Sequence, residues 1–303
     1  MFLVNPASAG GSTGKRWPEI AHRAAARGLD GDALISDGPG QLGALAADAI
    51  RGGATLLVVV GGDGSVNEVV NGVIAAGEGQ VELAVIPRGT GWDFVRTFDI
   101  PRDVDGAVDV ALDGAVRVID AGVVTYRTWA GDEARAHFAN VASAGISGAI
   151  AQRANESSKA LGGKVSYYWA TLAVFFGWQA GEMRVTVGDE TRSGRMIDAM
   201  ICNGRFVGGG MMMCPDAEPD DGVFDVLLIG DVTKRDLAFV LPKTYKGKHL
   251  PHPRLELLRG SVVTVDSVEP LPIELDGEQP GTTPARFEVV PRALALRVPQ
   301  ASP

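Results

Sequence analysis

Residues 58–67 read VVVGGDGSVN, a β-branched apolar run that ends in three glycines arranged around one aspartate. Such a run closed by glycines predicts a buried strand that leaves its sheet through a tight turn. Gly61 and Gly62 lack Cβ atoms, so backbone N–H groups can face an anion there, and we expect Ser65 to cap the helix that follows. The N–H groups at a helix N-terminus suit a phosphate. The alternative is a tight turn that binds nothing.

The composition predicts a folded globular protein of one large domain or two ordinary ones. The chain has 303 residues, of which 46% are hydrophobic and 21% charged, values that are ordinary for globular proteins. Its net charge of −9 argues against a nucleic-acid partner, which would require a clustered basic face. Cys202 and Cys214 have neither metal-ligand spacing nor a disulfide framework, so we expect buried thiols in a reducing compartment.

Neither the N-terminal segment nor the longest apolar stretch of the sequence suggests a membrane protein. The N-terminal MFLVNP lacks a basic region and reads as a first strand, so no export is expected. The longest apolar candidate, residues 167–178, is shorter than the roughly 20 residues that a spanning helix needs. We expect no membrane crossing.

The first part of the chain alternates strand and helix patterns. Strand-like FLVN, DALIS, TLLVVV and ELAVIP alternate with helical patterns at Trp17–Arg27, Gln41–Arg51 and Ser65–Ala76. This alternation is typical of βαβ units in a parallel sheet. After about residue 120 the chain changes to strands separated by turns: HFANVAS, MRVTVG, MIDAMICNG, FDVLLIG, SVVTVDS, PIELDGE and ARFEVV. Helices are predicted at Ile150–Ala160, Lys164–Trp178 and Thr233–Tyr245.

Together these patterns predict two domains. Residues 1–120 should form a parallel-sheet α/β domain, and residues 121–303 a β-rich domain arranged as a mostly antiparallel sandwich. The extreme C-terminus could return to the first domain. Ligands of parallel sheets bind beyond the carboxyl ends of the strands, where three loops rich in Gly, Ser or Pro fall: NPASAGGSTG, GGDGS and PRGTGWD. Three converging loops favour a nucleotide pocket, although neither GxxxxGK[ST] nor an opening GxGxxG is present.

Five motifs, spread over nearly the whole chain, are NPASAGG, GGDGSVNEVVNG, PRGTGWDFVRTFDIP, NGRFVGGGMMMCPDAEPDDGVFDV and ELDGE. Taken in this order, they resemble the successive motifs of the diacylglycerol kinase catalytic family, which includes bacterial lipid kinases and the sphingosine and ceramide kinases. NAD kinases and phosphofructokinases share GGDG alone, but the further motifs expected of them are not evident. The resemblance implies an N-terminal nucleotide-binding domain of the NAD kinase/diacylglycerol kinase type and a C-terminal β-sandwich.

The resemblance also assigns roles to individual residues. Asp276 would be the general base, and Glu278 would lie beside the nucleotide. Asp63 would organise the phosphates or their Mg²⁺. The remaining nucleotide-binding residues would be Asn5, Pro6, Ser8 and Ser36 around ATP, and Gly61, Gly62, Gly64, Ser65, Asn67 and Thr90 around its phosphates. A base is also required on chemical grounds, because transfer to an alcohol must remove the hydroxyl proton. The alternative for Asp276 and Glu278 is an ordinary Asp-Gly hairpin turn.

A structural Mg²⁺ is implied at PDAEPDDGVFD. Asp221 and the backbone carbonyls of Glu218 and Val223 would be its ligands, and oxygen ligands in a glycine-containing turn suit a hard cation. A solvated acidic loop is about equally plausible. Trp92 departs from the family, which usually has Asn there, although Asp93, Phe94 and Arg96 remain.

Three other features have both a structural and a functional interpretation. The aromatic stretch at residues 167–178 could bind lipid but is more often core, and Met211–Met213 could line an acyl pocket or fill gaps. The locally basic segment could meet anionic head groups or be a solvated loop; it comprises Lys243, Lys246, Lys248, His249 and His252.

The sequence therefore predicts an ATP- and Mg²⁺-dependent lipid kinase of phospholipid metabolism. Diacylglycerol is the leading acceptor, and a sphingoid base or another lipid alcohol is second. The rivals are a catalytically silent lipid or nucleotide sensor, which Trp92 favours, and a kinase with a soluble acceptor. We expect a cytoplasmic protein that contacts the membrane peripherally and binds no nucleic acid; a homodimer is expected only because dimers are common.

Overall fold

The computed structural model describes residues 1–300 apart from 78–80, 90, 158–173 and 176. The chain forms two compact units. The first unit comprises Met1–Ala121 together with the residues from Pro291 onward, and the second comprises Gly122–Val290. Two long strands, β5 (Ala115–Thr128) and β16 (Gly281–Val298), run across the boundaries between the units.

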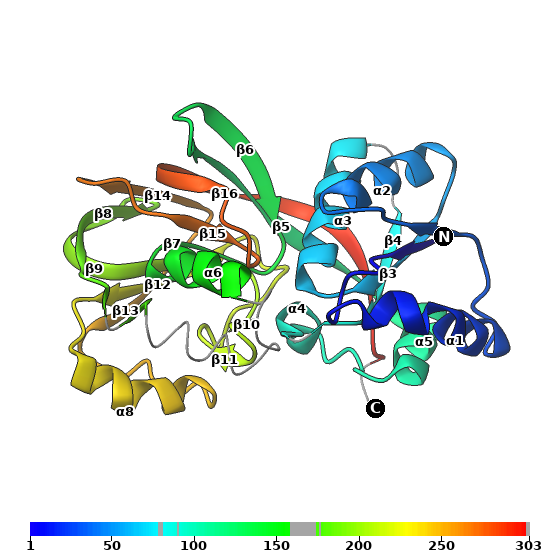
Figure 1. Ribbon diagram of the computed structural model, residues 1–303. Helices are drawn as coiled ribbons and strands as arrows, with labels where there is room; N and C mark the ends of the chain where they lie inside the picture. Colours follow the sequence, from blue (N-terminus) through cyan, green and yellow to red (C-terminus); the bar gives the residue numbers. More distant parts are fainter. Residues whose placement is uncertain (78–80, 90, 158–173, 176, 301–303) are drawn as a thin grey trace. The chain divides into compact units, whose positions relative to one another are not determined.

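The first unit is a parallel sheet with helices on both faces (Figure 1). Its strand order is β2-β1-β3-β4, and the end of β16 pairs in parallel with β4. The strands are β1 (Phe2–Val4), β2 (Ala33–Ile35), β3 (Leu56–Gly61) and β4 (Glu82–Pro87). The helices are α1 (Ser12–Ala26), α2 (Gln41–Arg51), α3 (Asp63–Ala76), α4 (Asp93–Thr97) and α5 (Val104–Asp113).

Apolar side chains on both faces of the strands hold this unit together. In β3, Val58 and Val60 pack with α1 and α5, while Leu57 and Val59 are fully buried on the opposite face. Strands buried on both faces read as continuous apolar runs, which explains VVV before the glycines. On that opposite face α2 and α3 cross closely, and a Cβ on Gly72 would lie 2.2 Å from the carbonyl oxygen of Gly43.

The second unit is built mainly from antiparallel strands, as predicted. The order β13-β12-β9-β8-β14 continues into the first half of β16, and β7 pairs with both β9 and β15. Its strands are β6 (Glu133–Phe138), β7 (Val141–Gly145), β8 (Gly181–Val187), β9 (Glu190–Cys202), β10 (Phe206–Val207), β11 (Met211–Met212), β12 (Phe224–Gly230), β13 (Leu255–Gly260), β14 (Val262–Ser267) and β15 (Ile273–Leu275). The helices with described bounds are α6 (Ile146–Ser157) and α8 (Lys234–Thr244).

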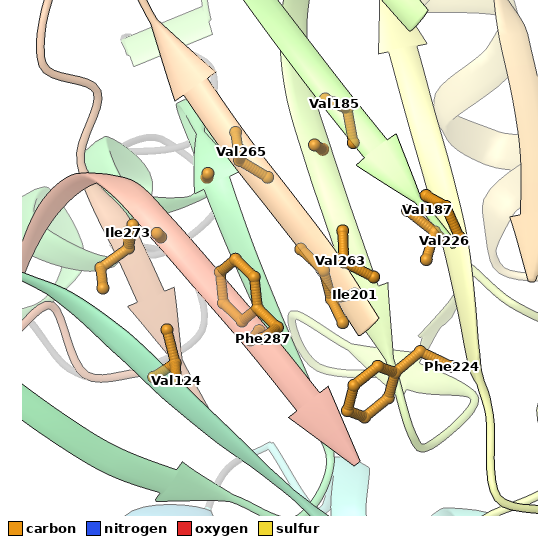
Figure 2. Close-up of a cluster of buried hydrophobic side chains, with 14 of the residues drawn as sticks. Val124, Val185, Val187, Ile201, Phe224, Val226, Val263, Val265, Ile273 and Phe287 are labelled. Atoms are coloured by element: carbon orange, nitrogen blue, oxygen red, sulfur yellow. The ribbon is translucent and has the colours of Figure 1, made fainter. Parts of the chain in front are cut away.

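Figure 2 shows the core of this unit, where valine, isoleucine and phenylalanine side chains from several strands meet. The rings of Phe138 and Phe224 stack with centroids 5.6 Å apart, and Phe287 lies edge-on to Phe138 at 6.2 Å. Burying each such side chain stabilises the fold by about 1.5–3 kcal/mol. A Cβ on Gly122 would lie 2.1 Å from the Phe138 ring, so this position requires glycine.

The structure corrects three local predictions. Ser65 is not the cap of α3, because the helix begins at Asp63 after Gly62 and the Ser65 hydroxyl instead accepts a hydrogen bond from Asn5 Nδ2 at 2.9 Å. HFANVAS is not one strand, since β6 ends at Phe138 and β7 begins at Val141. The helices expected at Trp17 and Ile150 begin earlier, at Ser12 and Ile146.

Other predictions are confirmed, and one falls mostly on residues that the structure does not describe. The bounds of α2 agree with the prediction, and Thr233 caps α8 in a capping box with Asp236. Cys202 and Cys214 are buried free thiols. Most of the helix expected at Lys164–Trp178 lies outside the described residues, but Phe175 is buried in an apolar cluster that includes Trp178. Of the helices that the structure describes, none is both long and apolar enough to cross a bilayer.

Candidate active site

In the first unit, the loops after β3 and β4 approach each other backbone to backbone. Gly62 precedes α3, and within the described residues no side-chain hydrogen bond caps this helix end. A Cβ on Gly89 would lie only 2.8 Å from Gly62 Cα, so this close approach requires glycine at position 89. The N–H groups of the first turn of a 14-residue helix therefore stand at the edge of the sheet, where an anion can be bound.

Asn5 ties the loop after β1 to the same helix start. Its Nδ2 donates to Ser65 Oγ at 2.9 Å, and its Oδ1 accepts from the N–H of Ala7 at 3.0 Å. Ser8 lies in the same loop, with its hydroxyl 2.9 Å from the Asn5 carbonyl and 2.6 Å from Thr13 Oγ1. The structure thus brings Asn5, Ser8 and Ser65 together, as a shared site requires.

The other residues predicted to bind the nucleotide have varied surroundings. Pro6 packs against α1, where a Cβ on Gly14 would lie 2.8 Å from Pro6 Cβ. Ser36 is buried, and its N–H donates to the Val4 carbonyl at 3.0 Å. Gly64 and Asn67 lie in the first part of α3, and the Asn67 carbonyl accepts from Asn71 Nδ2. Thr90 lies outside the described residues.

Asp63 begins α3 but its carboxylate is directed to the start of α4. Its Oδ1 accepts a hydrogen bond from the N–H of Phe94 at 3.1 Å, and a Cβ on Gly91 would lie 2.6 Å from its Oδ2. Burial raises the pKa of Asp63, and the N–H groups around it oppose that rise. This aspartate therefore fixes the loop after β4 relative to the loop after β3.

In the second unit, Asp276 follows β15 in a tight turn and adopts a left-handed backbone with φ 49°. Leu275 and Glu278 exchange backbone hydrogen bonds at 2.8 and 2.9 Å across this turn. The predicted hairpin turn is therefore present. Its aspartate has a further role, because the carboxylate reaches a distant segment of the chain.

That segment is the gap between β6 and β7. Asp276 Oδ2 accepts from the N–H of Ala139 at 2.8 Å, and Oδ1 accepts from Asn140 at 3.0 Å and Val141 at 2.9 Å. Three N–H donors match an ionised carboxylate, which can only accept hydrogen bonds. They also explain why the expected strand HFANVAS is interrupted, since these backbone groups point at a side chain.

Two buried carboxyl groups, those of Glu274 and Asp198, lie near the turn that holds Asp276. Glu274 accepts a hydrogen bond from the N–H of Gly277, and its Oε2 lies 3.3 Å from the hydroxyl of Ser143. Asp198 interacts with both the N–H and the hydroxyl of Ser147 at the start of α6. Burial raises the pKa of Glu274 to about 8 and the pKa of Asp198 to about 7. The raised pKa favours the neutral form of Glu274 near neutral pH, which limits the negative charge beside Asp276.

The predicted metal turn holds Glu218, Asp221 and Val223 close together. Asp221 forms an ion pair with Arg259 and accepts from the N–H of Val223 at 3.1 Å. The Glu218 side chain pairs with Arg205. Across the part of the chain that the structure describes, no cluster of three or more His, Cys, Asp or Glu side chains is arranged to hold a metal ion.

Two models of known protein families match this chain, one in each unit. The diacylglycerol kinase catalytic domain matches residues 1–124, and the YegS C-terminal NAD kinase beta sandwich-like domain matches residues 140–298. The chain belongs to the diacylglycerol kinase catalytic family. As a member of this family it is a kinase, a phosphotransferase with an alcohol acceptor, and the family resemblance seen in the motifs is confirmed.

Curated relatives in this family are similar over about nine tenths of their length. A diacylglycerol kinase of Staphylococcus saprophyticus is 25% identical over 94% of this chain and 90% of its own, and one of Staphylococcus epidermidis is 26% identical over 99% and 92%. A solved structure of a diacylglycerol kinase from Bacillus anthracis covers 98% of this chain and 95% of its own, with a TM-score of 0.70 at 22% identity. A second structure from the same strain reaches 0.74 at 21% identity. These structures confirm the predicted fold class.

The surroundings of the family's glycine-rich loops fit the phosphates of a nucleotide, and Arg88 adds to this fit. Arg88 Nη2 is 3.3 Å from Ser12 Oγ, whereas its buried Nε has no hydrogen-bond partner among the described residues. Burial lowers the pKa of Arg88, but a guanidinium remains charged in proteins. A partly buried guanidinium with an unpartnered Nε, next to the close approach of Gly62 and Gly89 (the glycine cradle), suits an anion.

A structural Mg²⁺ fits less simply. The acidic turn offers a carboxylate and backbone carbonyls, which are the ligands that Mg²⁺ takes. Because Asp221 pairs with Arg259, a metal ion would have to replace this ion pair or share the carboxylate with it. The metal ligands therefore stay a prediction.

Trp92, which stands where the family usually has Asn, has an unusual backbone conformation. Trp92 precedes α4 with a left-handed backbone, φ 59°, and the Arg102 guanidinium lies 4.7 Å from the centre of its ring. Asn tolerates this conformation better than a bulky residue does. The family's usual Asn is thus explained by the backbone, while Trp92 gains a cation–π contact instead.

Sequence reasoning missed Arg88, Glu274 and Asp198. Arg88 directly follows β4 at the head of a glycine-rich loop, and that position is a usable signal. Glu274 lies between Ile273 and Leu275, and Asp198 lies within MIDAMIC. A single acid inside an apolar strand indicates a buried carboxyl group, and both residues could have been selected on that basis.

Proposed function

We propose that this protein is an ATP-dependent lipid kinase that transfers the γ-phosphoryl group to a lipid hydroxyl, with diacylglycerol as the acceptor and phosphatidic acid as the product. Membership of the family supports phosphoryl transfer to an alcohol. The choice of diacylglycerol is supported by the names of relatives that match along nearly their whole length. A sphingoid base or another lipid alcohol is the second choice of acceptor.

The observation that carries the proposal is the carboxylate of Asp276, oriented by three backbone N–H groups. As the acceptor oxygen bonds to the γ-phosphorus and the bond from phosphorus to the ADP oxygen breaks, the acceptor hydroxyl must lose its proton. Asp276 is the proposed recipient of that proton. Because burial raises the pKa of Glu274, that neighbour adds little negative charge beside Asp276 at neutral pH.

In the first unit, the proposed ligands of the triphosphate are the N–H groups at the start of α3 and the guanidinium of Arg88. Their support is the glycine cradle and the buried Nε that lacks a partner among the described residues. Asn5 and Ser8, which are joined to the same helix start, are proposed to border the nucleotide. Mg²⁺, when bound, would neutralise phosphate oxygens during the transfer.

A lipid acceptor requires contact with a membrane surface. We place the protein in the cytoplasm, where ATP is available, and in peripheral contact with the bilayer. The test of function is labelled phosphate transfer from γ-labelled ATP, with Mg²⁺, to mixed micelles that contain diacylglycerol, a sphingoid base or a monoacylglycerol. Wild-type protein is compared with Asp276→Asn, and ATP binding by both is measured calorimetrically.

We expect label in diacylglycerol, and a fall in kcat of about 10²–10⁴-fold in Asp276→Asn, because this is the range that a positioned base contributes. ATP binding should be retained in the variant. Label in the sphingoid base alone would change the acceptor, and turnover only with soluble alcohols would remove the lipid. A wild-type protein that binds ATP but labels no acceptor would be a sensor, the alternative that Trp92 supports.

A further inference from the structure

The helix α8 and the turn after it present a continuous face of cations and aromatic side chains. Arg235, Phe239, Pro242, Lys243 and Lys246 follow the spacing i, i+4, i+7, i+8 and i+11, which places them on one side of a helix. All five are exposed, and Phe239 retains 66% of its accessible surface. We call these five residues the α8 face. Figure 1 shows α8 at the periphery of the second unit.

The cations of this face are not neutralised by acids of the protein. Arg235, Lys243 and Lys246 form no ion pair with any residue that the structure describes, and neither does the exposed Lys248 beside them. The nearby Asp236 is held in the capping box by Thr233. In a chain of net charge −9, four unneutralised cations within 14 residues form a local positive surface.

The turn after α8 is anchored to another segment of the second unit. The buried His249 ring lies 3.0 Å from the Met213 carbonyl, and a Cβ on Gly247 would lie 2.8 Å from Pro215. At the end of the helix, Thr244 is buried and donates to the Leu241 carbonyl at 2.7 Å. Phe239, by contrast, is one of the six large apolar residues left exposed in the described chain.

We propose that the α8 face docks the protein on a bilayer that contains anionic lipids. Lysine and arginine would contact the anionic head groups while Phe239 inserts at the level of the head groups, the arrangement typical of interfacial helices. The negative net charge repels such a surface elsewhere, so a local positive face also orients the protein. The inference rests on the proposed function only in that a lipid acceptor requires a bilayer.

The test is co-sedimentation of the whole protein with phosphatidylcholine vesicles, with and without phosphatidylglycerol. The variants are Lys243→Glu/Lys246→Glu, Phe239→Ser, and a control, Arg127→Glu/Arg135→Glu, which makes the same charge change at exposed positions of β5 and β6. Circular dichroism checks that each variant is folded. All the altered side chains are exposed, so none is needed for folding.

We expect wild-type protein to bind the anionic vesicles, to bind phosphatidylcholine alone much less, and to be released as salt rises. The lysine variant should lose about 30-fold or more in affinity, since each basic residue near such a surface contributes about a factor of five. Phe239→Ser should lose several-fold, and the control little. Failure of the wild type to bind, or an equal loss in the control, overturns the proposal.

A separate readout keeps this outcome apart from the proposed kinase activity. Turnover of a short-chain diacylglycerol below its aggregation concentration requires no membrane. We expect the lysine variant to keep wild-type turnover there. Vesicle binding without any such turnover in the wild type would contradict the kinase and leave the docking face intact, whereas turnover without vesicle binding would contradict the docking face alone.

Discussion

The GGDGS loop of the first unit and the LDGE turn of the second unit both contain an aspartate beside glycine at the end of a strand. Their chemistry differs. Asp63 is buried and holds the start of α4, so the loops after β3 and β4 leave N–H groups and Arg88 where an anion could bind. Asp276 receives three N–H groups from the break between β6 and β7 and itself supplies negative charge. Under the proposed function, the same dipeptide would support anion binding in one unit and proton acceptance in the other.

The contrast between Asp63 and Asp276 is tested first by substituting Asp63, which should have the largest effect, on the stability of the first unit. Asp63→Ala leaves the Phe94 N–H without its acceptor and should lower the free energy of unfolding by about 2–3 kcal/mol, measured by urea denaturation. Asp63→Asn keeps one acceptor oxygen and should lose about half as much. ATP affinity should fall in both, unlike in Asp276→Asn. Equal losses in the two Asp63 variants would show that this hydrogen bond is not what matters.

A pH dependence should follow from the buried acid behind Asp276. Because burial raises the pKa of Glu274 to about 8 from an ordinary value of 4.5, the folded protein binds more protons than the unfolded chain between these values. The free energy of unfolding should therefore fall as pH rises through this window, by about 1 kcal/mol per pH unit from this residue. Asp198, raised to about 7, adds in the same direction.

Glu274→Gln removes this titration while keeping the shape of the protonated side chain. Its free energy of unfolding relative to the wild type should rise by about 2 kcal/mol between pH 6 and pH 8, in urea titrations at both pH values. The matched control is Glu269→Gln, an exposed site where no change is expected. If Glu274→Gln is less stable than the wild type at pH 8, then Glu274 is ionised and stabilised in the folded protein.

The smallest effect separates two glycines of the first unit. A Cβ on Gly89 would lie 2.8 Å from backbone, whereas the nearest heavy atom to a Cβ on Gly62 would be 3.3 Å away. Gly89→Ala should therefore force the loops apart and weaken ATP binding about tenfold, equivalent to roughly 1.4 kcal/mol. Gly62→Ala should be milder. Isothermal titration with ATP would decide the order, and the reverse order would mean that the two loops do not meet through these atoms.

Much of the architecture could be predicted because its signals are local. Helical sequence patterns located α2 to the residue and α8 to within one residue at each end. Glycine-rich loops after successive parallel strands indicated one edge of the sheet, where Asn5, Ser8 and Ser65 do lie together. Such features depend on neighbours in the sequence, and the family motifs supplied the rest.

The features that could not be predicted depend on residues far apart in the chain. The break at Ala139–Asn140 is caused by Asp276, 136 residues after Asn140. Ser65 lost its expected capping role because the helix begins at Asp63 and Asn5 occupies its hydroxyl, 60 residues away. The partners of Asp63 and the unpartnered Nε of Arg88 follow from tertiary contacts as well. The roles assigned to the individual site residues stay predictions that the variants above test.

The course of β16 has a consequence for biosynthesis. Its last residues pair with β4, and Arg297 bonds to Glu82 and to the carbonyls of Leu112 and Gly114, so the first unit includes residues that are synthesised after the whole second unit. The second unit is one continuous segment, Gly122–Val290. During translation the second unit can therefore be finished before the first, and a nascent chain stalled before residue 291 would lack the part of β16 that pairs with β4 in the sheet of the first unit.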